Sequence, residues 1–408
     1  MEMKEKNEKI TALLGWSLQA IEAIDKLNRP YVVVGPPEFK PFADNNGILF
    51  VPWQFNVPIE HSVELYEQLK ELNTKVAIPI YEETVEWAGM LNSLIWENPK
   101  VFNKSLLLRD KSLMKRRAHL AGLRVGVFEE AFTKENIKHF LKRINEALLN
   151  TDEENFEPIH VKPFDKAGTV GHRMISKYEE IEEIDDSEFP LLMESHLEGQ
   201  EFSCEAFVHN GKVKFLNITE YVKLGHSNFV PASPTLEQWR PQIRATIEKL
   251  VEAFEVTHGI LHPEFFLTPD GTIYFGEVAA RIPGGHIFEH IERVYGFSPY
   301  QGQVLCSDPD TTEEELNAFF PEEVVSAKGH SGNLMVYPKV KSINKLNIPT
   351  ELKEHPYFLK HNMFIPTTAK VAERVGYGNH YGSIYFFGED SKEMRSLLEE
   401  YEKHNFYL

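Results

Sequence analysis

Two glutamates on neighbouring apolar runs have the spacing that most directly predicts chemistry in this chain. Glu264 and Glu277 lie in aromatic-rich runs at residues 261–267 and 272–279, and the turn-forming sequence Thr-Pro-Asp-Gly separates the runs. The pattern predicts a β-hairpin with a four-residue loop. In that hairpin the two side chains point to one face, directly opposite or one diagonal apart, with Cβ atoms about 4.5–8 Å apart.

Two carboxylates at this separation predict a bound cation. In strands that are otherwise apolar, they repel each other and lose hydration unless a positive charge lies between them. Oxygen ligands suit Mg²⁺ or Mn²⁺, and Mg²⁺ commonly takes one or two carboxylates together with substrate phosphates. Arg281 and the pair Gly284-Gly285 follow, and they supply a cation and a backbone that can approach a ligand closely. The alternative is a surface hairpin that carries two solvated glutamates.

A lysine followed by a glycine loop predicts a phosphate-binding segment at residues 159–172. Lys162 lies in a strand-like run that ends at a proline, and the loop behind it contains Gly168, Thr169 and a second glycine. The lysine can reach phosphate oxygens, while glycine lets backbone N–H groups close over the rest. The alternative for Lys162 is a lysine on a solvent-facing strand. Lys111 opens a basic helix and, taken alone, is typical of a solvated helix lysine.

A strand, a break and a second strand are predicted in residues 189–208. The break covers residues 194–199, and in the second strand Glu201, Ser203 and Glu205 alternate outward with apolar residues that point inward. Such a break exposes main-chain donors and acceptors that can bind a purine edge. A carboxylate at position 201 can accept hydrogen bonds from ribose hydroxyls. The alternative is an amphipathic edge strand without a ligand.

A loop at residues 220–234 is the candidate position for a further substrate. It contains Lys223 and His226 among Gly, Ser, Asn and Pro residues. The alternative is a loop histidine without a role.

The elements that must position these residues alternate between strands and helices. A strand at 10–14, a helix at 17–27 and a strand at 31–35 predict the opening of a doubly wound parallel layer, which continues with a helix at 60–72 and a strand at 75–80. The chain lacks Gly-x-Gly-x-x-Gly at this place, so dinucleotide binding has no support.

Two longer helices and a C-terminal region complete the predicted elements. Helices are expected at 133–149 and at 240–254, and the second packs on the hairpin. Strand-like runs at 332–337, 363–365 and 383–388 precede a final helix at 391–404, which predicts a small α+β cap without a catalytic constellation.

Composition excludes several classes of protein. The chain has 408 residues, a length that favours two to three domains, with 42% hydrophobic and 26% charged residues, as in ordinary globular proteins. A formal net charge of −19 argues against binding to a nucleic acid backbone. No apolar run is long enough for a membrane span, and no signal peptide precedes the first strand. Cys204 and Cys306 lie among apolar residues, which indicates core positions in a reducing compartment. We therefore expect a cytoplasmic protein.

The order of these motifs resembles the ATP-grasp superfamily of ligases, over about residues 8–305. The motifs are Asp110-Lys111, Lys162-Pro163, the glycine loop, Glu194 with Glu201, Glu264 with Glu277, Arg281 and Gly284-Gly285. The sequence Glu-Val-Ala-Ala-Arg is most similar to L-amino acid ligases (dipeptide synthetases) and related carboxylate–amine ligases. The resemblance implies an ATP-grasp fold of classes α/β and α+β. Its expected parts are an N-terminal Rossmann-like domain at 1–107, a central lid subdomain at 108–192, a C-terminal ATP-grasp subdomain at 193–319 and an α+β cap at 320–408.

The resemblance also implies a role for each candidate residue. Arg281 and Lys162 would be catalytic, with Arg281 stabilising the acyl phosphate and the tetrahedral species that follows. ATP would contact Lys111, Lys162, Gly168, Thr169, Glu194, Ser195, His196, Leu197 and Glu201. Glu264 and Glu277 would bind Mg²⁺ (or Mn²⁺), and His226, Gly284 and Gly285 would contact the substrate. For the base that activates the amine, His226 and Glu205 are the candidates.

Two departures from the family pattern limit what can be transferred. Ala279 stands where many ATP-grasp enzymes have an asparagine that ligates metal, which leaves the number of metal ions open. Gly285 stands where some L-amino acid ligases have a bulky aromatic residue, which implies a roomier substrate pocket.

The activity implied is ATP-dependent joining of a carboxylate and an amine through an acyl phosphate, with release of ADP and phosphate. The expected partners are small-molecule carboxylate and amine substrates, with amino acids among the candidates, and neither nucleic acid nor membrane; a homodimer is a further candidate. Two alternatives stay open, an ATP-grasp phosphotransferase and a non-catalytic ATP-binding regulatory protein. The sequence does not identify the acid, the amine or a carrier protein.

Overall fold

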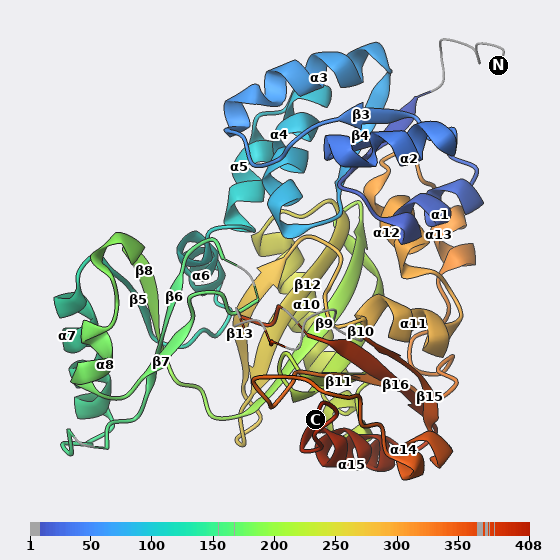
Figure 1. Cartoon of the computed structure of the whole chain (residues 1–408). Coiled ribbons are helices and arrows are strands. Elements are labelled where there is room, and N and C mark those ends of the chain that lie inside the picture. The colour runs from blue at the N-terminus through green and yellow to red at the C-terminus, as the bar shows by residue number, and fades with distance from the viewer. Residues whose placement is uncertain are drawn as a thin grey trace.

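A computed structural model of the chain describes residues 9–408 apart from 154, 167, 365–369, 372, 373, 375 and 379. Ala167, in the predicted glycine loop, and Ile365, in the predicted run 363–365, therefore lie outside the described residues. The described strands form three sheets, and helices cover them (Figure 1). The predicted combination of α/β and α+β classes is confirmed.

The N-terminal layer is a parallel sheet of strand order β3-β2-β1-β4. Its strands are β1 (Ile10–Leu14), β2 (Tyr31–Gly35), β3 (Phe50–Pro52) and β4 (Thr74–Pro79). Its helices are α1 (Leu18–Lys26), α2 (Lys40–Asn45), α3 (Ser62–Glu71), α4 (Val85–Ile95) and α5 (Lys100–Leu107). All five residues of β1 are buried, as expected for a parallel strand with helices on both faces. The doubly wound opening predicted from the sequence is confirmed.

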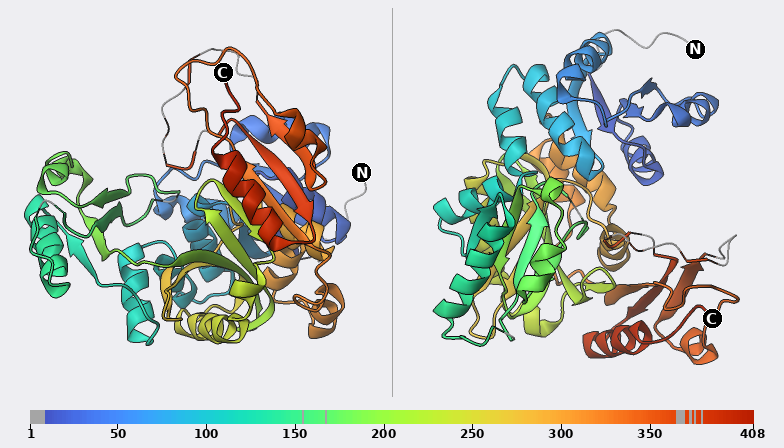
Figure 2. Two further views of the ribbon diagram at one scale, coloured as in Figure 1. Left: turned by 90° about the horizontal axis from the view of Figure 1, so that it is seen from below. Right: turned by 60° about the vertical axis from the view of Figure 1, so that its left-hand side comes forward.

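A smaller antiparallel sheet of order β5-β8-β6-β7 follows. Its strands are β5 (Phe128–Ala131), β6 (Ile159–Pro163), β7 (Arg173–Ile175) and β8 (Leu191–Ser195). The helices of this part are α6 (Lys111–Leu120), α7 (Lys134–Ala147) and α8 (Tyr178–Glu182). Figure 2 shows that the lobe formed by these strands with α7 and α8 projects from the rest of the molecule.

The largest sheet has eight antiparallel strands in the order β13-β12-β9-β10-β11-β14-β16-β15. Its strands are β9 (Gln200–His209), β10 (Lys212–Lys223), β11 (Ser227–Val230), β12 (His258–Leu267), β13 (Ile273–Ala279), β14 (His330–Met335), β15 (Phe358–Met363) and β16 (Gly382–Gly388). The helices are α9 (Pro234–Glu237), α10 (Arg240–Ala253), α11 (Ile287–Tyr295), α12 (Pro299–Ser307), α13 (Glu313–Phe319), α14 (Thr350–Glu354) and α15 (Ser391–Glu402). The C-terminal strands thus continue the sheet that carries the hairpin.

Alternation along β9 divides the core between the two faces of this sheet. Phe202, Cys204 and Ala206 pack with α6 and α10 in one apolar cluster, while Phe207 packs with α11 and α12 in another. Both cysteines are buried and free, as predicted. No helix in the described ranges combines the length and the hydropathy needed to cross a bilayer.

The predicted hairpin is formed by β12 and β13, and its register changes along its length. Near the turn, Leu267 pairs with Ile273, whereas Glu264 pairs with Glu277 beyond a bulge at Gly276. The predicted four-residue loop is wrong, because the turn closes one residue later. The bulge then adds one residue to β13, so the two glutamates still lie opposite each other, as predicted. A Cβ atom at Gly276 would lie 2.9 Å from the Glu264 carbonyl oxygen, so the bulge needs glycine.

Candidate active site

Two cavities meet at the paired glutamates of the hairpin. The first, of about 500 Å³, contains Lys111, Lys115 and Lys162 in its wall and is called the lysine cavity here. The second, of about 390 Å³, contains Arg109 and Arg281 and is called the arginine cavity. Both cavities are lined by Lys111, Gly168, Thr169, Leu224, Glu264 and Glu277. A group held at the two glutamates therefore faces both spaces.

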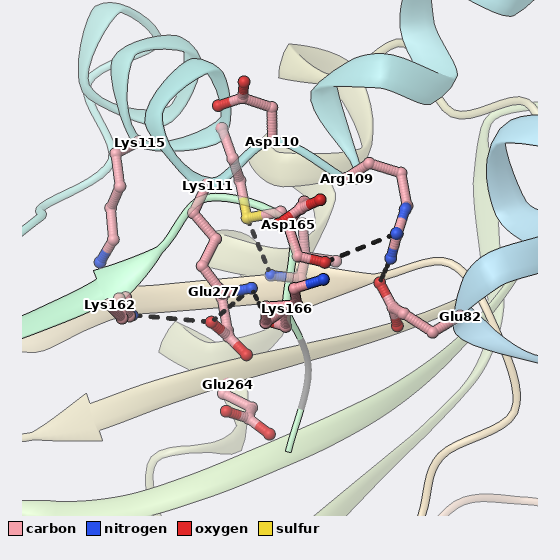
Figure 3. Close-up of polar contacts among 12 residues, drawn as sticks. Glu82, Arg109, Asp110, Lys111, Lys115, Lys162, Asp165, Lys166, Glu264 and Glu277 are labelled. Carbon is pink, nitrogen blue, oxygen red and sulfur yellow. Dashed lines mark hydrogen bonds and ion pairs between the residues drawn. The ribbon is translucent and has the colours of Figure 1, made fainter. Parts of the chain in front are cut away.

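Lysines surround the carboxylate of Glu277. Its Oε2 atom lies 3.6 Å from Lys162 Nζ and 3.8 Å from Lys111 Nζ (Figure 3). Burial alone would raise the pKa of Glu277, but the charges of Lys111 and Lys162 lower it, so the carboxylate is ionised. Within the described ranges no group of three His, Cys, Asp or Glu side chains could hold a metal ion. The donor set of Glu264 and Glu277 fits Mg²⁺ that takes its remaining ligands from phosphate and water.

A second carboxylate, Glu194, lies between two lysines at the end of β8. Its two oxygen atoms are each 2.5 Å from a lysine, Oε1 from Lys115 Nζ and Oε2 from Lys162 Nζ. Burial would raise the pKa of Glu194, but Lys115 and Lys162 hold it well below its usual range. Burial would lower the pKa of Lys162, and Glu194 and Glu277 raise it above its ordinary value. These groups form a charged wall that is already in place before any phosphate binds.

Helix α6 explains how one short segment supplies two of these lysines. Asp110 caps the helix, with its carboxylate accepting from Ser112 N at 2.8 Å and Leu113 N at 2.9 Å. Lys111 then occupies the first helical position and Lys115 lies one turn later, so both point to the same side. Lys115 is absent from the predicted site, although its spacing from Lys111 is a signal that could have identified it.

The glycine loop lies at the junction of the two cavities. Gly168 and Thr169 both have positive φ, +62° and +61°, and line both spaces. Lys111 Nζ donates to the Lys166 carbonyl at 2.5 Å, and the Gly168 carbonyl accepts from Tyr377 N at 2.9 Å. The loop is thus tied to helix α6 on one side and to the C-terminal region on the other.

The predicted purine-binding segment follows β8 into the wall of the lysine cavity. Ser195 N donates to the Val127 carbonyl at 2.8 Å, and the side chains of His196 and Leu197 line the cavity. His196 Nδ1 lies 2.9 Å from His160 Nε2, and His160 Nδ1 lies 2.9 Å from His172 Nε2. Burial, followed by the neighbouring histidines, lowers the pKa of His160 to about 4, so this ring is neutral near pH 7.

Glu201 lines the same cavity in an environment that favours its protonated form. Burial, together with the carboxylates of Glu264 and Glu277, raises the pKa of Glu201 to about 8. A neutral carboxyl group can donate as well as accept a hydrogen bond, so it can pair with a ribose hydroxyl in either sense.

The outward face of β9 is buried, which the alternation did not indicate. Ser203 and Glu205 are both fully buried. Glu205 accepts hydrogen bonds from Asn217 at 2.6 Å and Thr219 at 2.7 Å, and lies 3.0 Å from His262 Nδ1. The prediction that Glu205 faces outward is wrong, because β10 and β12 place polar side chains over it.

His262 connects this buried carboxylate to the hairpin. Its Nε2 atom lies 3.5 Å from Glu264 Oε1. Burial would lower the pKa of His262, but hydrogen bonds to Glu205 and Glu264 raise it to about 9. The imidazolium lies between two carboxylates and orients Glu264 toward the cavities. His262 was not among the predicted residues.

An ion-pair network forms one wall of the arginine cavity. Glu82, from the short helical turn before α4, accepts from Arg109 Nη1 at 2.5 Å (Figure 3). It also accepts from Arg281 Nε at 2.8 Å. Burial would raise the pKa of Glu82, but Arg281 and Arg109 lower it. Neither Glu82 nor Arg109 was predicted, because the three residues come from separate segments and no local pattern connects them.

The two predicted substrate glycines differ in their surroundings. A Cβ atom at Gly285 would lie 2.8 Å from Asn228 Nδ2, which donates to the Gly285 carbonyl at 2.9 Å. Gly285 also has φ +63°. The expectation of a roomier pocket at Gly285 is therefore wrong, because Asn228 occupies that space. Gly284 has no heavy atom within 4 Å of a Cβ position, so the open side of the cavity lies there.

The structure does not bring His226 to either cavity. Its N–H closes the β10–β11 turn onto the Lys223 carbonyl at 2.9 Å, and its ring lies against Tyr337, 4.8 Å between centroids, and near Arg374. The predicted substrate role of His226 is corrected for this reason, and so is its candidacy as a base. Glu205 is also corrected as a base, since it lies behind His262 and lines neither cavity.

The C-terminal region, predicted as an α+β cap without a catalytic constellation, contributes residues to the lining of the site. Met335, Tyr377 and His380 line the arginine cavity. Tyr377 packs over the β10–β11 turn, where a Cβ atom at Gly225 would lie 2.1 Å from its ring. Long connections of this kind carry no periodic signal, so sequence alone could not place them.

Comparison with known proteins gives the same fold. Residues 155–289 match a protein family described as ATP-grasp domain. The L-arginine-specific L-amino acid ligase of Bacillus subtilis is 24% identical over 249 residues, which span 57% of this chain and 58% of that protein. The solved L-amino acid ligase of Bacillus licheniformis superposes with a TM-score of 0.74 at 18% identity and 99% coverage of both chains.

Another solved structure of similar fold contains a bound nucleotide. N5-carboxyaminoimidazole synthetase from Staphylococcus aureus, complexed with ADP, superposes with a TM-score of 0.65 at 17% identity, covering 97% of this chain and 98% of that one. Together the family match over residues 155–289 and these structures confirm the fold that the motifs predicted, the ATP-grasp fold.

Proposed function

We propose that the chain is an ATP-dependent carboxylate–amine ligase, which forms an amide bond through an acyl phosphate and releases ADP and phosphate. The observation that carries the proposal is the junction of the two cavities at Glu264 and Glu277. A nucleotide in the lysine cavity directs its terminal phosphate to this junction, and a carboxylate in the arginine cavity reaches it from the other side. The names of the similar proteins, L-amino acid ligases among them, support this assignment.

The lysine cavity holds the nucleotide in this proposal. Lys111 and Lys162 neutralise phosphate oxygens, and the Gly168–Thr169 backbone closes over them. Residues 194–197 bind the purine, and Glu201 binds the ribose. Lys115 does not touch phosphate; it fixes Glu194, and Glu194 in turn fixes the Lys162 ammonium at 2.5 Å.

Glu264 and Glu277 would hold Mg²⁺ (or Mn²⁺), and the ion would offset charge on the phosphate oxygens. The chain's own contribution is to aim both carboxylates at one point. Lys111 and Lys162 pair with Glu277, and His262 pairs with Glu264.

The arginine cavity holds the carboxylate and then the amine. Arg281, fixed by Glu82, stabilises charge on the acyl phosphate and on the tetrahedral species formed when the amine attacks. The amine nitrogen forms the new bond to the acyl carbon and the C–O bond to phosphate breaks. The phosphate leaves with that electron pair and takes up the proton that the nitrogen loses. The contact between Tyr377 and the glycine loop limits entry of water, which would hydrolyse the acyl phosphate.

The proposed substrates are small molecules, with amino acids as the first class to test. The protein acts in the cytoplasm in this proposal, and a homodimer is the proposed assembly. Neither nucleic acid nor a membrane is a proposed partner, in agreement with the net charge of −19.

The decisive experiment uses the purified chain with Mg²⁺, ATP and pooled amino acids. ADP release that depends on an acid, together with an amide product found by mass spectrometry, is the expected result. Hydroxylamine added in place of the amine should trap the acyl phosphate as a hydroxamate. A stable phosphorylated product seen by ³¹P NMR would instead identify a phosphotransferase, and nucleotide binding without turnover would identify a binding protein.

A further inference from the structure

A third cavity lies between the N-terminal layer and the largest sheet, away from the paired glutamates. Its volume is about 540 Å³, and it is bounded by β4, α4 and α5 on one side and by residues 254–257 after α10, by α12 and by the first residues of β12 on the other. Figure 1 shows α4 and α5 above this end of β12. Most of its surface is apolar, with side chains that include Val76, Val85, Ala88, Val101, Phe254 and Ile260. We call it the interlayer cavity.

The interlayer cavity opens to solvent between exposed polar residues. Asn98, Asn210 and Glu255 are exposed and belong to its lining. A ligand can therefore enter without passing through the lysine or arginine cavity.

One wall of the interlayer cavity is a strand edge without a neighbour. Strand β12 pairs with β9 from His258 onward, but its pairing with β13 begins only at His262. Among the described strands, none covers the other edge of residues 258–261, and His258, Gly259 and Ile260 line the cavity there.

The backbone direction shows which groups this edge presents. The Thr257 carbonyl accepts from Gly211 N at 2.9 Å, at the turn between β9 and β10, so it points toward β9. Successive residues of a strand direct their N–H and C=O groups to opposite edges. Ile260 therefore directs both groups to the uncovered edge. Glu264, an even number of residues further along β12, directs its backbone groups to the same edge as Ile260. Its carbonyl oxygen lies 2.9 Å from a Cβ position at Gly276 of β13, which confirms this direction.

The charges of the interlayer cavity are already compensated. Lys104 Nζ lies 2.8 Å from Glu255 Oε2, and these are the charged side chains of its described lining. Burial, followed by the neighbouring His209, lowers the pKa of His258 to about 4, so this ring is neutral near pH 7. An ionised ligand would find no unpaired countercharge, and its desolvation would oppose binding.

We propose that the interlayer cavity binds an uncharged amide with an apolar side chain, such as a blocked amino acid or a short apolar peptide segment. One extended residue of the ligand pairs its N–H and C=O with the C=O and N–H of Ile260, as a single residue of an added strand would. The apolar side chain lies against Val85, Val101 and Phe254. This chemistry differs from that of the arginine cavity, whose arginines suit ionised substrates.

The experiment measures binding of N-acetyl-L-leucinamide to the full chain without nucleotide. We expect a Kd of about 1 mM, typical of a ligand of this size, and slower deuterium exchange in a peptide that contains residues 258–261. The matched probe is N-acetyl-N-methyl-L-leucinamide, which lacks the N–H that would pair with the Ile260 carbonyl. It should bind at least tenfold more weakly.

Two variants block the cavity at different places, so that an effect of one substitution on folding does not decide the test. Val101→Trp fills the cavity from α5, and Asn98→Trp fills its exposed mouth; either should weaken binding at least tenfold. Asn103→Trp, exposed on the same helix and outside the lining, is the matched control and should bind normally. Absence of binding to the wild-type chain, equal binding of the N-methyl probe, or binding that survives both blocking variants would each overturn the proposal.

Discussion

The lysine cavity and the arginine cavity share Glu264 and Glu277, yet the other charged residues that distinguish them come from different kinds of element. Strands line much of the lysine cavity: Lys162 lies on β6, Glu194 on β8 and Glu201 on β9. The arginine cavity takes Glu82, Arg109, Arg281 and Tyr377 from turns and connections that are far apart in the chain. A strand fixes the direction of each side chain through its alternation, whereas a connection depends on contacts with other segments.

This difference predicts how the two cavities respond to mutation. Charges in the lysine cavity are held by several partners, so a substitution there should act on nucleotide binding while leaving the fold intact. In the arginine cavity a single carboxylate holds two arginines, so its loss should act on the carboxylate substrate. The following variants test that separation, from the largest expected effect to the smallest.

Glu277→Gln should affect both cavities, since the residue lies at their junction. Loss of one of the two carboxylates proposed to hold the metal should lower kcat of the proposed reaction about 10²- to 10³-fold or more. The measurement is ADP release at saturating substrates, with thermal unfolding to show that the fold is retained. Glu198→Gln, an exposed residue in the lining of the lysine cavity, is the matched control and should keep normal activity. Wild-type kcat in Glu277→Gln would refute the metal assignment.

Lys162→Ala should act on the nucleotide alone. Removal of a charge-assisted contact to phosphate should raise the Kd of an ATP analogue about 10- to 100-fold. Binding of the carboxylate substrate should change less than threefold. Calorimetric titration of each ligand separates the two effects, and Lys138→Ala, a surface lysine of the same lobe paired with Glu182, serves as control. An unchanged nucleotide Kd would mean that Lys162 serves only to pair Glu194.

Glu82→Gln should act on the arginine cavity alone. Without this carboxylate, Arg281 and Arg109 lose their common partner, and a displaced catalytic arginine should lower kcat/KM for the carboxylate about 10-fold or more. The Kd of the ATP analogue should stay within twofold of the wild-type value. Glu83→Gln, the neighbouring exposed residue outside the cavity lining, is the control. Equal losses for nucleotide and carboxylate would show that the two cavities are not separable.

The smallest expected effect is the difference between alanine substitutions at two neighbouring glycines of the arginine cavity. Gly285→Ala introduces a Cβ atom 2.8 Å from Asn228 Nδ2 at φ +63°, and should cost about 1 kcal/mol of stability and raise KM for one substrate several-fold. Gly284→Ala places its Cβ in open space and should change neither quantity beyond error. Thermal unfolding and steady-state kinetics of both variants check this. Identical behaviour of the two would contradict the packing described for Asn228.

The sequence located site residues correctly where the side chain lies on a strand or in the first turn of a helix. Lys162, Glu264 and Glu277 could be located because alternation and turn chemistry limit the choices to two faces. Glu82 and Tyr377 could not be located, since their positions depend on how distant segments pack. For His226 the sequence predicted a role that the structure does not support. The residue types of its loop are typical of a ligand site, but the turn directs its ring to Tyr337.

Because of the bulge at Gly276, the hairpin tolerates changes in the length of its loop but not a change at position 276. Residues 268–272 can vary in number without moving Glu277, provided that the extra residue at position 276 keeps the pairing with Glu264. A side chain at position 276 that prevented the bulge would leave residue 276 opposite Glu264 and shift Glu277 by one strand position. Its carboxylate would then point into the apolar cluster that holds Val278, and Val278 would face the cavities instead. One residue without a side chain thus decides whether this sheet presents a carboxylate or a hydrocarbon to its ligands.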